Sequence, residues 1–181
     1  MVRPMEAAQV QKLDAAIRDV PDFPKPGILF KDITPVMADG DLFKLSIAAF
    51  LDIAEELGPV DKIVGIDARG FIFGAAVAHH LGIGFIPVRK KGKLPWETES
   101  VAYDLEYGSN EVEIHTDAVQ PGESVLLVDD LLATGGTAGA AVDLIEKIGG
   151  KLLGLAFLIE LGFLNGREKL GDAEVRSILT Y

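Results

Sequence analysis

The chain has 181 residues, of which 49% are hydrophobic and 25% are charged, a length and composition typical of one globular domain with a sizeable core. Seventeen basic and 28 acidic residues give a formal charge of -11, which disfavours non-specific binding to nucleic acid or to an anionic membrane surface. The lack of cysteine excludes disulfides, thiolate metal sites and a cysteine nucleophile.

The N-terminal twenty residues lack the continuous apolar core of a signal peptide, and no later run reaches the ~18 apolar residues of a membrane span. We therefore expect a cytoplasmic protein that binds neither membrane nor nucleic acid. No repeat, low-complexity tract or linker divides the sequence, so we predict a single domain over residues 1–181.

The first elements surround a proline-rich segment. Hydrophobic residues at helical spacing predict a helix over Met5–Val20 that ends at Pro21. Residues 21–35 contain four prolines, which exclude a continuous helix and indicate an ordered loop that carries a short strand over Gly27–Ile33. A second helix is predicted over Asp41–Leu57.

Strands and helices alternate from residue 61 onward. The predicted helices cover 70–82 and 137–148, and the predicted strands cover 62–66, 84–88, 101–107, 111–115, 124–130, 152–161 and a final segment near 175–181. Segments 101–107 and 111–115 form an antiparallel pair in this prediction. The remaining alternation predicts an α/β fold, with a largely parallel twisted sheet flanked by helices and right-handed crossovers.

The segment "VLLVDDLLATGGT", Val125–Thr137, carries the most specific chemistry. Four aliphatic residues in five positions predict a strand buried on both faces. Asp129 and Asp130 would then lie at its carboxyl end, where open α/β sheets bind ligands. Gly135 and Gly136 precede an amphipathic helix, so their backbone N–H groups are available to an anion.

The two carboxylates would repel a phosphate that they faced, so they suit ribose hydroxyls or a hydrated Mg²⁺. The hydroxyls of Thr134 and Thr137 add donors beside the glycines. Acid pair and glycine turn together predict a sugar-phosphate site. The alternative is a solvated strand end followed by an ordinary tight turn. A Walker P-loop is excluded, since no G-x-x-x-x-G-K-[ST] occurs.

This segment resembles the phosphoribosyl-pyrophosphate motif of the type I phosphoribosyltransferases. Five further segments extend the resemblance to the adenine phosphoribosyltransferase family: "PDFPKPGILFKDITP", "GIDARGFIFG", "RKKGKLP", "YDLEYG" and "LNGREKL". The match runs from about residue 21 to the end. It implies the type I phosphoribosyltransferase fold, with an N-terminal hood that binds the base over about 1–35, a core over about 36–181, and a mobile two-stranded catalytic loop.

The resemblance implies transfer of the 5-phosphoribosyl group of phosphoribosyl pyrophosphate to N9 of adenine, which yields AMP and pyrophosphate in purine salvage. Asp129 and Asp130 would hold the ribose hydroxyls. The 5′-phosphate would be held by the backbone and hydroxyls of Ala133, Thr134, Gly135, Gly136 and Thr137. The acids could also stabilise positive charge at C1′ as pyrophosphate leaves.

Pyrophosphate would bind to two further segments. By resemblance, the Asp67–Ala68 turn holds it, often through a cis peptide, and Arg69 grips its oxygens in a bidentate manner. Arg89, Lys90 and Lys93 would add the cations that the acidic chain otherwise lacks. The alternatives are a surface ion pair for Arg69 and a solvated charge run for "VRKKGKLP".

Glu106, in "YDLEYG", corresponds to the family's acid/base residue at the purine N7, and with Arg69 it completes the predicted catalytic pair. Closure of the loop would raise the Glu106 pKa and exclude water. Tyr103 and Tyr107 would shape this lid. From the residues alone, the alternating segment 101–115 predicts only a hairpin.

Adenine would bind against "GILFKD", where Phe30 stacks on the purine and the backbone near Leu29 and Lys31 meets its hydrogen-bonding edge. Leu161 would cover the other face of the ring. Core packing is the alternative for Phe30. Many relatives carry arginine at the position of Lys31, so a role that needs a fork of donors does not transfer to this chain.

Mg²⁺ is the expected cofactor and would be held mainly by the substrate, without a dedicated protein site. His79 and His80 are adjacent on a predicted helix and point about 100° apart, so they cannot chelate one ion and are assigned a surface or interface role. The resemblance also implies a homodimer, in which a cation of the basic segment reaches across the interface.

Overall fold

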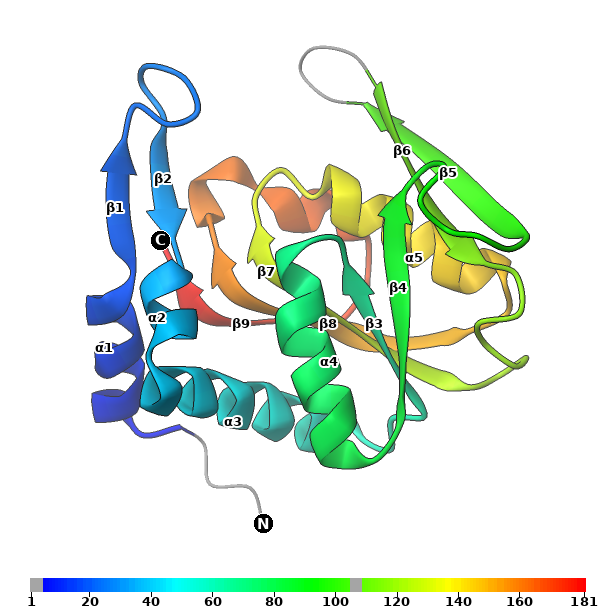
Figure 1. The fold of residues 1–181 in the computed structure, drawn as a ribbon, viewed down its shortest axis with the longest axis horizontal. Helices are drawn as coiled ribbons and strands as arrows, with labels where there is room; N and C mark the ends of the chain where they lie inside the picture. The colour runs from blue at the N-terminus through cyan, green and yellow to red at the C-terminus, as the bar shows by residue number, and fades with distance from the viewer. Residues whose placement is uncertain (1–4, 105–108) are drawn as a thin grey trace.

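The computed structural model describes residues 5–104 and 109–181 and contains two sheets with helices around the larger one (Figure 1). Its helices are α1 (Ala7–Ala16), α2 (Thr34–Ala38), α3 (Gly40–Leu57), α4 (Arg69–Leu81), α5 (Gly136–Lys147) and the 3-10 turns η1 (Gly162–Leu164) and η2 (Gly166–Leu170). Its strands are β1 (Arg18–Pro21), β2 (Leu29–Asp32), β3 (Lys62–Ile66), β4 (Gly84–Lys90), β5 (Thr98–Asp104), β6 (Ser109–His115), β7 (Ser124–Leu132), β8 (Lys151–Glu160) and β9 (Val175–Thr180).

The larger sheet has the strand order β5-β6-β4-β3-β7-β8-β9 within the described residues. Strands β4, β3, β7, β8 and β9 are parallel, whereas β6 pairs antiparallel with β4 and β5 antiparallel with β6. The predicted α/β class with a largely parallel sheet is confirmed. The predicted antiparallel pair is confirmed as β5 and β6, and its connection at 105–108 lies outside the described residues.

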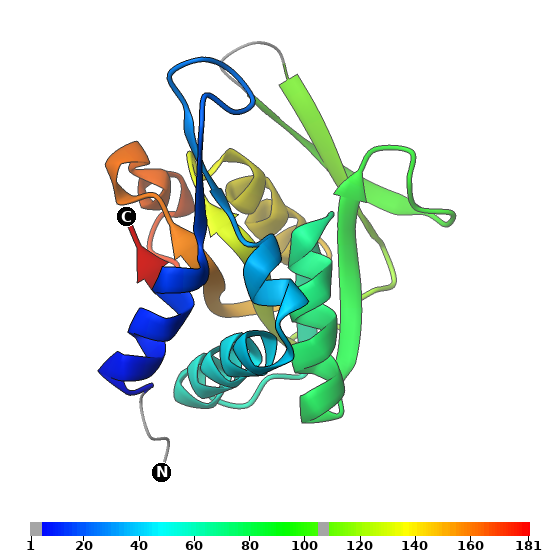
Figure 2. The same cartoon turned by 60° about the vertical axis from the view of Figure 1, so that its left-hand side comes forward.

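The central strands contain continuous apolar runs because both faces of the sheet are covered. Helices α3 and α4 lie on one side and α5 on the other (Figures 1 and 2). In β7, Val125 and Leu127 enter the core cluster that contains α5, while Leu126 and Val128 enter the cluster that contains α3 and α4. All four are 0% exposed, so the continuous hydrophobic run is explained by two packing faces.

The chain crosses from β3 through α4 to β4 on one side, and from β7 through α5 to β8 on the other. Neighbouring strands β3 and β7 therefore mark the point where the order of the sheet reverses. Ligands of open α/β sheets bind in the crevice outside the carboxyl ends of such strands.

The N-terminal prediction was wrong beyond Ala16. The helix over Met5–Val20 ends there, since Ile17 is extended (φ -70°, ψ 124°). The following residues form β1, which pairs with β2 from Arg18↔Asp32 to Pro21↔Leu29. Pairing with a distant strand outweighed helical periodicity, and the resulting hairpin rises from the body of the molecule beside the C-terminus (Figure 1).

Three short helical segments were not predicted: α2, η1 and η2. Helix α2 begins within the proline-rich segment and contains proline in its first turn, where the missing N–H costs no hydrogen bond. Apart from β1, which the predicted N-terminal helix had covered, the other elements were predicted within a few residues of their ends.

The position of the two acids also needs a correction. Strand β7 does not end at Asp130, because it continues in register with β8 as far as Leu132↔Glu160. Asp130 is 7% exposed and Leu132 is 1% exposed. Burial therefore extends past the acid pair, since β8 is long enough to cover it.

Candidate active site

A pocket of about 270 Å³ lies at the carboxyl ends of β3 and β7, and we call it the switch-point pocket. Its walls come from the β3–α4 turn, the acid pair and the loop that leads into α5. The lining residues are Ile66, Asp67, Ala68, Arg69, Asp129, Asp130, Leu131, Leu132, Ala133, Thr134, Gly135, Gly136, Thr137 and Ala138. Every residue predicted for the phosphoribosyl group lines this one pocket.

The glycine turn, residues 133–137, leads directly into the N-terminus of α5. Gly135 is the N-cap residue and has φ +78°, a left-handed conformation that favours glycine. A Cβ atom at Gly135 would lie 2.2 Å from the carbonyl oxygen of Gly166. The lack of a side chain at Gly135 thus permits backbone contact with Gly166. From the sequence, this glycine was related only to the binding of an anion.

The acid pair is largely withdrawn from solvent. An Asp129 carboxylate oxygen accepts a hydrogen bond from the backbone N–H of Asp130 at 2.9 Å. Burial, followed by the negative charge of Asp130, raises the pKa of Asp129 well above its ordinary value. Two adjacent carboxylates that are shielded from water repel one another, which raises the free energy of the charged pair. A ligand that donates hydrogen bonds to them lowers that free energy.

Arg69 is the first residue of α4 and follows the cis peptide between Asp67 and Ala68. Its Nε donates to Oδ2 of Asp130 at 2.5 Å, across 61 positions of sequence. Its guanidinium carbon lies 5.9 Å from the centre of the Phe30 ring. The alternative for Arg69 was a surface ion pair with an acidic neighbour. Arg69 does form an ion pair, but its partner is Asp130 of the acid pair, and both residues line the pocket.

The basic segment approaches the same turn from β4. Arg89 Nε donates to Oδ2 of Asp67 at 2.9 Å, and its Nη1 donates to the carbonyl oxygen of Lys93 at 3.2 Å. Arg89 therefore connects the β3–α4 turn to the loop that carries Lys93. Lys90 and Lys93 are exposed, and none of the three cations lines the switch-point pocket.

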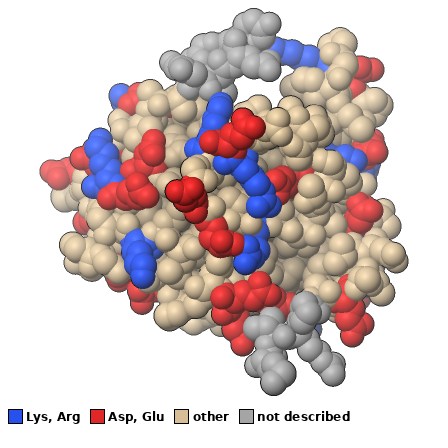
Figure 3. All heavy atoms as spheres, turned by 180° about the vertical axis from the view of Figure 1, so that it is seen from behind, with Lys and Arg blue, Asp and Glu red and all other residues tan. Residues whose placement is uncertain are grey.

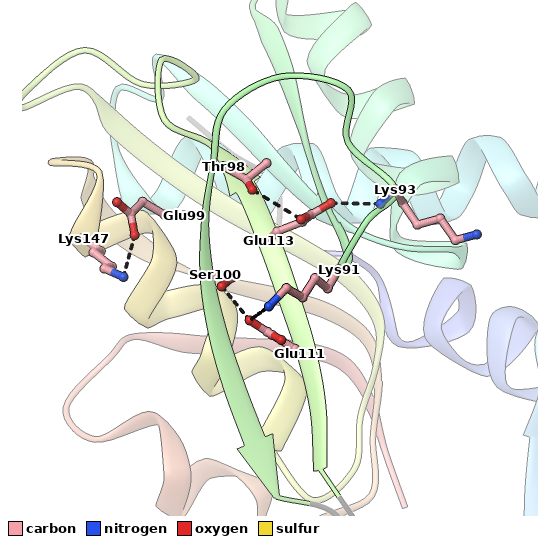
Figure 4. A network of polar contacts seen from close by, with 8 residues as sticks. All are labelled: Lys91, Lys93, Thr98, Glu99, Ser100, Glu111, Glu113 and Lys147. Carbon is pink, nitrogen blue, oxygen red and sulfur yellow. Dashed lines mark hydrogen bonds and ion pairs between the residues drawn. The ribbon is translucent and has the colours of Figure 1, made fainter.

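Sequence reasoning missed Glu113, which holds this basic loop in place (Figure 4). The side chain is 3% exposed, and its Oε1 accepts the backbone N–H groups of Lys93 at 2.9 Å and Leu94 at 2.8 Å. The Lys93 ammonium points away from it (Figure 4). The sequence did contain a signal for this role, since Glu113 stands between two aliphatic residues of a predicted strand. A charge that is buried in this way needs hydrogen-bonding partners.

Strand β5 also contacts the glycine turn. The hydroxyl of Thr137 donates to the Tyr103 hydroxyl at 3.1 Å. Tyr103 thus connects the strand before the predicted lid to the predicted phosphate site. Glu106 and Tyr107, the other residues predicted for this lid, lie outside the described residues.

The hairpin of β1 and β2 carries three of the four predicted base-binding residues, Leu29, Phe30 and Lys31. Leu29 is 49% exposed, and Phe30 packs edge-on against Phe23 with ring centres 5.2 Å apart. Phe30 is only partly buried. The Lys31 ammonium instead contacts Asp19 at 2.6 Å and lies 3.8 Å from the centre of the Tyr181 ring. The side chain of Lys31 therefore fastens the hairpin to the C-terminus.

Leu161 immediately follows β8, and its backbone N–H donates to the Leu132 carbonyl at 2.9 Å. This places it beside the start of the glycine turn. His79 and His80 are exposed in the last turn of α4, and Trp96 is 66% exposed. Over residues 5–104 and 109–181, no cluster of three or more histidines and acids is arranged to hold a metal ion.

Charges of both signs are interspersed on the face that Figure 3 shows, and no continuous basic surface covers it. The part of the chain that the structure describes contains no helix long and apolar enough to cross a membrane.

The seven-stranded sheet of the described residues and its switch-point pocket, with an acid pair beside a glycine turn, define a type I phosphoribosyltransferase. Residues 41–178 match the phosphoribosyl transferase domain family. An adenine phosphoribosyltransferase of Nitrosococcus oceani is 54% identical over 172 residues, which cover 95% of this chain and 100% of the relative.

Solved structures agree with this match. The adenine phosphoribosyltransferase of Rhodothermus marinus has a TM-score of 0.92 and 51% identity, with 97% of this chain and 100% of the other covered. The Saccharomyces cerevisiae enzyme, solved with adenine and an imino-altritol bisphosphate, has a TM-score of 0.91 and 45% identity, with 96% and 100% covered. The chain belongs to the adenine phosphoribosyltransferase family.

Proposed function

We propose that this chain transfers the 5-phosphoribosyl group of phosphoribosyl pyrophosphate to N9 of adenine, forming AMP and pyrophosphate in purine salvage. The observation that carries the proposal is the switch-point pocket, in which an acid pair, an arginine and a glycine turn at a helix N-terminus line one cavity. These groups match a sugar phosphate, because the acids accept from hydroxyls and the turn donates to a phosphate. The adenine-bound relative supports the choice of base.

The phosphoribosyl group would occupy the pocket itself. Asp129 and Asp130 accept the ribose hydroxyls, and the 5′-phosphate takes the N–H groups and hydroxyls of residues 133–137. In the free protein Asp130 accepts from Arg69 at 2.5 Å. Substrate would replace that contact with a ribose hydroxyl and leave the guanidinium to the pyrophosphate.

Pyrophosphate would lie at the β3–α4 turn, held by the Asp67–Ala68 backbone and by Arg69. Arg89, Lys90 and Lys93 supply further positive charge from the basic segment. Support comes from the contact of Arg89 with both Asp67 and Lys93. In a homodimer, which we also propose, a cation of this exposed segment reaches the partner's pocket.

Adenine would lie beneath the hood, against Phe30 and the backbone of Leu29 and Lys31, with Leu161 on its other face. The 5.9 Å separation between Arg69 and the Phe30 ring supports this arrangement, because it brings the hood to the edge of the pocket. Glu106 would share or supply the proton at N7. The acid pair would stabilise the positive charge that develops at C1′.

Mg²⁺ would enter with phosphoribosyl pyrophosphate. This ion is commonly bound by one or two carboxylates and substrate phosphates, and Asp129 and Asp130 fit that donor set. When bound, it neutralises charge on the departing pyrophosphate. We further propose one domain over residues 1–181, with the hood over about 1–35, and a cytoplasmic location.

The test is an assay of the purified protein with phosphoribosyl pyrophosphate, Mg²⁺ and one of adenine, guanine, hypoxanthine or xanthine. We expect nucleotide and pyrophosphate in equal amounts from adenine alone. Preference for guanine would overturn the assignment of the base. Binding of phosphoribosyl pyrophosphate without turnover of any base would instead indicate a sensor that keeps the site.

A further inference from the structure

The segment "LNGREKL", residues 164–170, has no role in the reaction described above. It spans the end of η1 and all of η2, and its backbone packs against the glycine turn. None of its residues lines the switch-point pocket. Its contacts nevertheless reach the backbone that would hold the 5′-phosphate.

Gly166 is in direct backbone contact with the glycine turn. A Cβ atom on Gly166 would lie 2.3 Å from the carbonyl oxygen of Ala133 and 3.1 Å from the backbone nitrogen of Gly135. The reciprocal atom on Gly135 would lie 2.2 Å from the Gly166 carbonyl oxygen. The two backbones thus pack against each other with no side chain between them, so a displacement of one moves the other.

Arg167 fixes the segment to the strand beside the turn. Its Nε and Nη2 donate to the two carboxylate oxygens of Glu160, each at 2.7 Å, and its Nη1 donates to the Val175 carbonyl at 3.2 Å. Ser177 donates to the same carboxylate at 2.6 Å. A bidentate pair of this kind restricts orientation as well as distance.

Glu160 is the last residue of β8, and its side chain is 9% exposed. It is in register with Leu132, the residue before the glycine turn. The pair therefore joins η2 to the strand ends from which the turn departs. Gly166 therefore lies between this pair and the turn, in contact with the backbone of the turn.

We propose that Gly166 and the Arg167–Glu160 pair are positioning residues for the 5′-phosphate of the phosphoribosyl substrate. The proposal rests on the proposed function, because it assigns the glycine turn to that phosphate. A purely structural role would weaken all ligands together with the fold. A positioning role weakens only ligands that carry the 5′-phosphate, and leaves pyrophosphate at the β3–α4 turn unaffected.

Calorimetric titration of the full chain with ribose 5-phosphate, and separately with pyrophosphate and Mg²⁺, tests this distinction. The variants are Gly166→Ala and Arg167→Lys, and the second keeps the charge but loses the fork of donors. Gly40→Ala is the control for the first, since nothing lies within 4 Å of its new methyl group and its φ is not positive. Arg176→Lys, at an exposed ion pair, controls the second.

For Gly166→Ala we expect affinity for ribose 5-phosphate to fall by about tenfold to a hundredfold, because a small misplacement of binding groups is costly. Arg167→Lys should show a smaller loss of affinity for ribose 5-phosphate. Pyrophosphate affinity should match the controls in both variants, and the melting temperature of Arg167→Lys should fall only modestly, because lysine keeps the charge beside Glu160 but loses the second hydrogen bond to it. With phosphoribosyl pyrophosphate as substrate, KM should rise more than kcat falls.

Two results would overturn the proposal: unchanged ribose 5-phosphate binding in both variants, or equal loss of both ligands with a lowered melting temperature. If Gly166→Ala does not fold, Arg167→Lys alone decides between these outcomes. A wild-type chain that binds no ribose 5-phosphate would overturn the assignment of the glycine turn to the 5′-phosphate, and the positioning role with it, whereas the transferase assay with adenine tests the proposed function separately.

Discussion

Arg69 donates from Nε to Oδ2 of Asp130 at 2.5 Å, and so links the N-terminus of α4 to the acid pair of β7. The Asp130 side chain is 9% exposed, whereas that of Arg69 is 43% exposed. The cation therefore lies at the mouth of the pocket and the acid on its floor. In the proposed reaction, substrate separates the two, so the contact is part of the free state that binding replaces.

The first prediction concerns this pair. Asp130→Asn removes the charged acceptor from both Arg69 and the ribose. A hydrogen bond to a charged group contributes about 1.5–3 kcal/mol, so we expect kcat/KM for phosphoribosyl pyrophosphate to fall by roughly ten- to a hundredfold. Steady-state kinetics would measure this, with Asp39→Asn as control, because asparagine also caps a helix N-terminus such as that of α3. Unchanged kinetics would remove Asp130 from the ribose site.

The second prediction follows from the raised pKa of Asp129, caused by burial and then by the charge of Asp130. A carboxyl whose pKa is higher in the fold than in the unfolded chain costs stability once pH exceeds its unfolded pKa. Asp129→Asn keeps the oxygen that accepts from the Asp130 N–H but removes this cost. We expect its free energy of unfolding at pH 7 to exceed that of wild type.

Urea unfolding across pH would measure the difference, which should shrink as pH falls toward the ordinary pKa of aspartate. Activity should fall in the same variant, since the acceptor charge for the ribose is lost. A variant no more stable than wild type at pH 7, or a gap independent of pH, would contradict this account.

The third prediction concerns the basic loop. Burial raises the pKa of Glu113, but the backbone N–H groups of Leu94, Gly92 and Lys93 outweigh it and leave that pKa below its usual range. The stabilisation is therefore present above the unfolded pKa and is lost as pH falls through the folded one. Glu113→Gln should lower the free energy of unfolding at neutral pH by about 1–3 kcal/mol.

The same variant should raise KM for phosphoribosyl pyrophosphate more than it lowers kcat, because the loop carries Lys93 and contacts Arg89. Glu111→Gln is the matched control, on the same strand but in an exposed ion pair with Lys91. Equal effects of the two substitutions would show that Glu113 has no special role in placing the loop.

The fourth prediction tests the residue whose role rests on family resemblance alone. Glu106→Gln removes the proposed acid/base group, and general acid–base catalysis contributes about 10²–10⁴-fold. We expect kcat to fall within that range while the dissociation constant of adenine changes little. Single-turnover kinetics and equilibrium binding would separate the two quantities. An unchanged kcat would exclude Glu106 from proton transfer.

The sequence by itself determined the alternation of buried strands and helices, the acid pair and the glycine turn. It could do so because these features are local. An apolar run such as 125–128 indicates two covered faces wherever its neighbours lie, and glycines before an amphipathic helix indicate free N–H groups. The segments that resemble the family are likewise contiguous in the chain.

Only the tertiary structure decided which distant residues meet. The helix ends before Ile17 because the following residues form β1, which pairs with β2. The hydrophobic periodicity of the sequence does not contain information about this pairing. Arg69 and Asp130 are 61 positions apart, and Glu113 serves a loop twenty positions earlier. The contact between Gly135 and Gly166 depends on the register of β7 with β8. Local sequence fixes backbone tendency and burial, whereas contacts between loops depend on strand order and register, which arise only when the sheet forms.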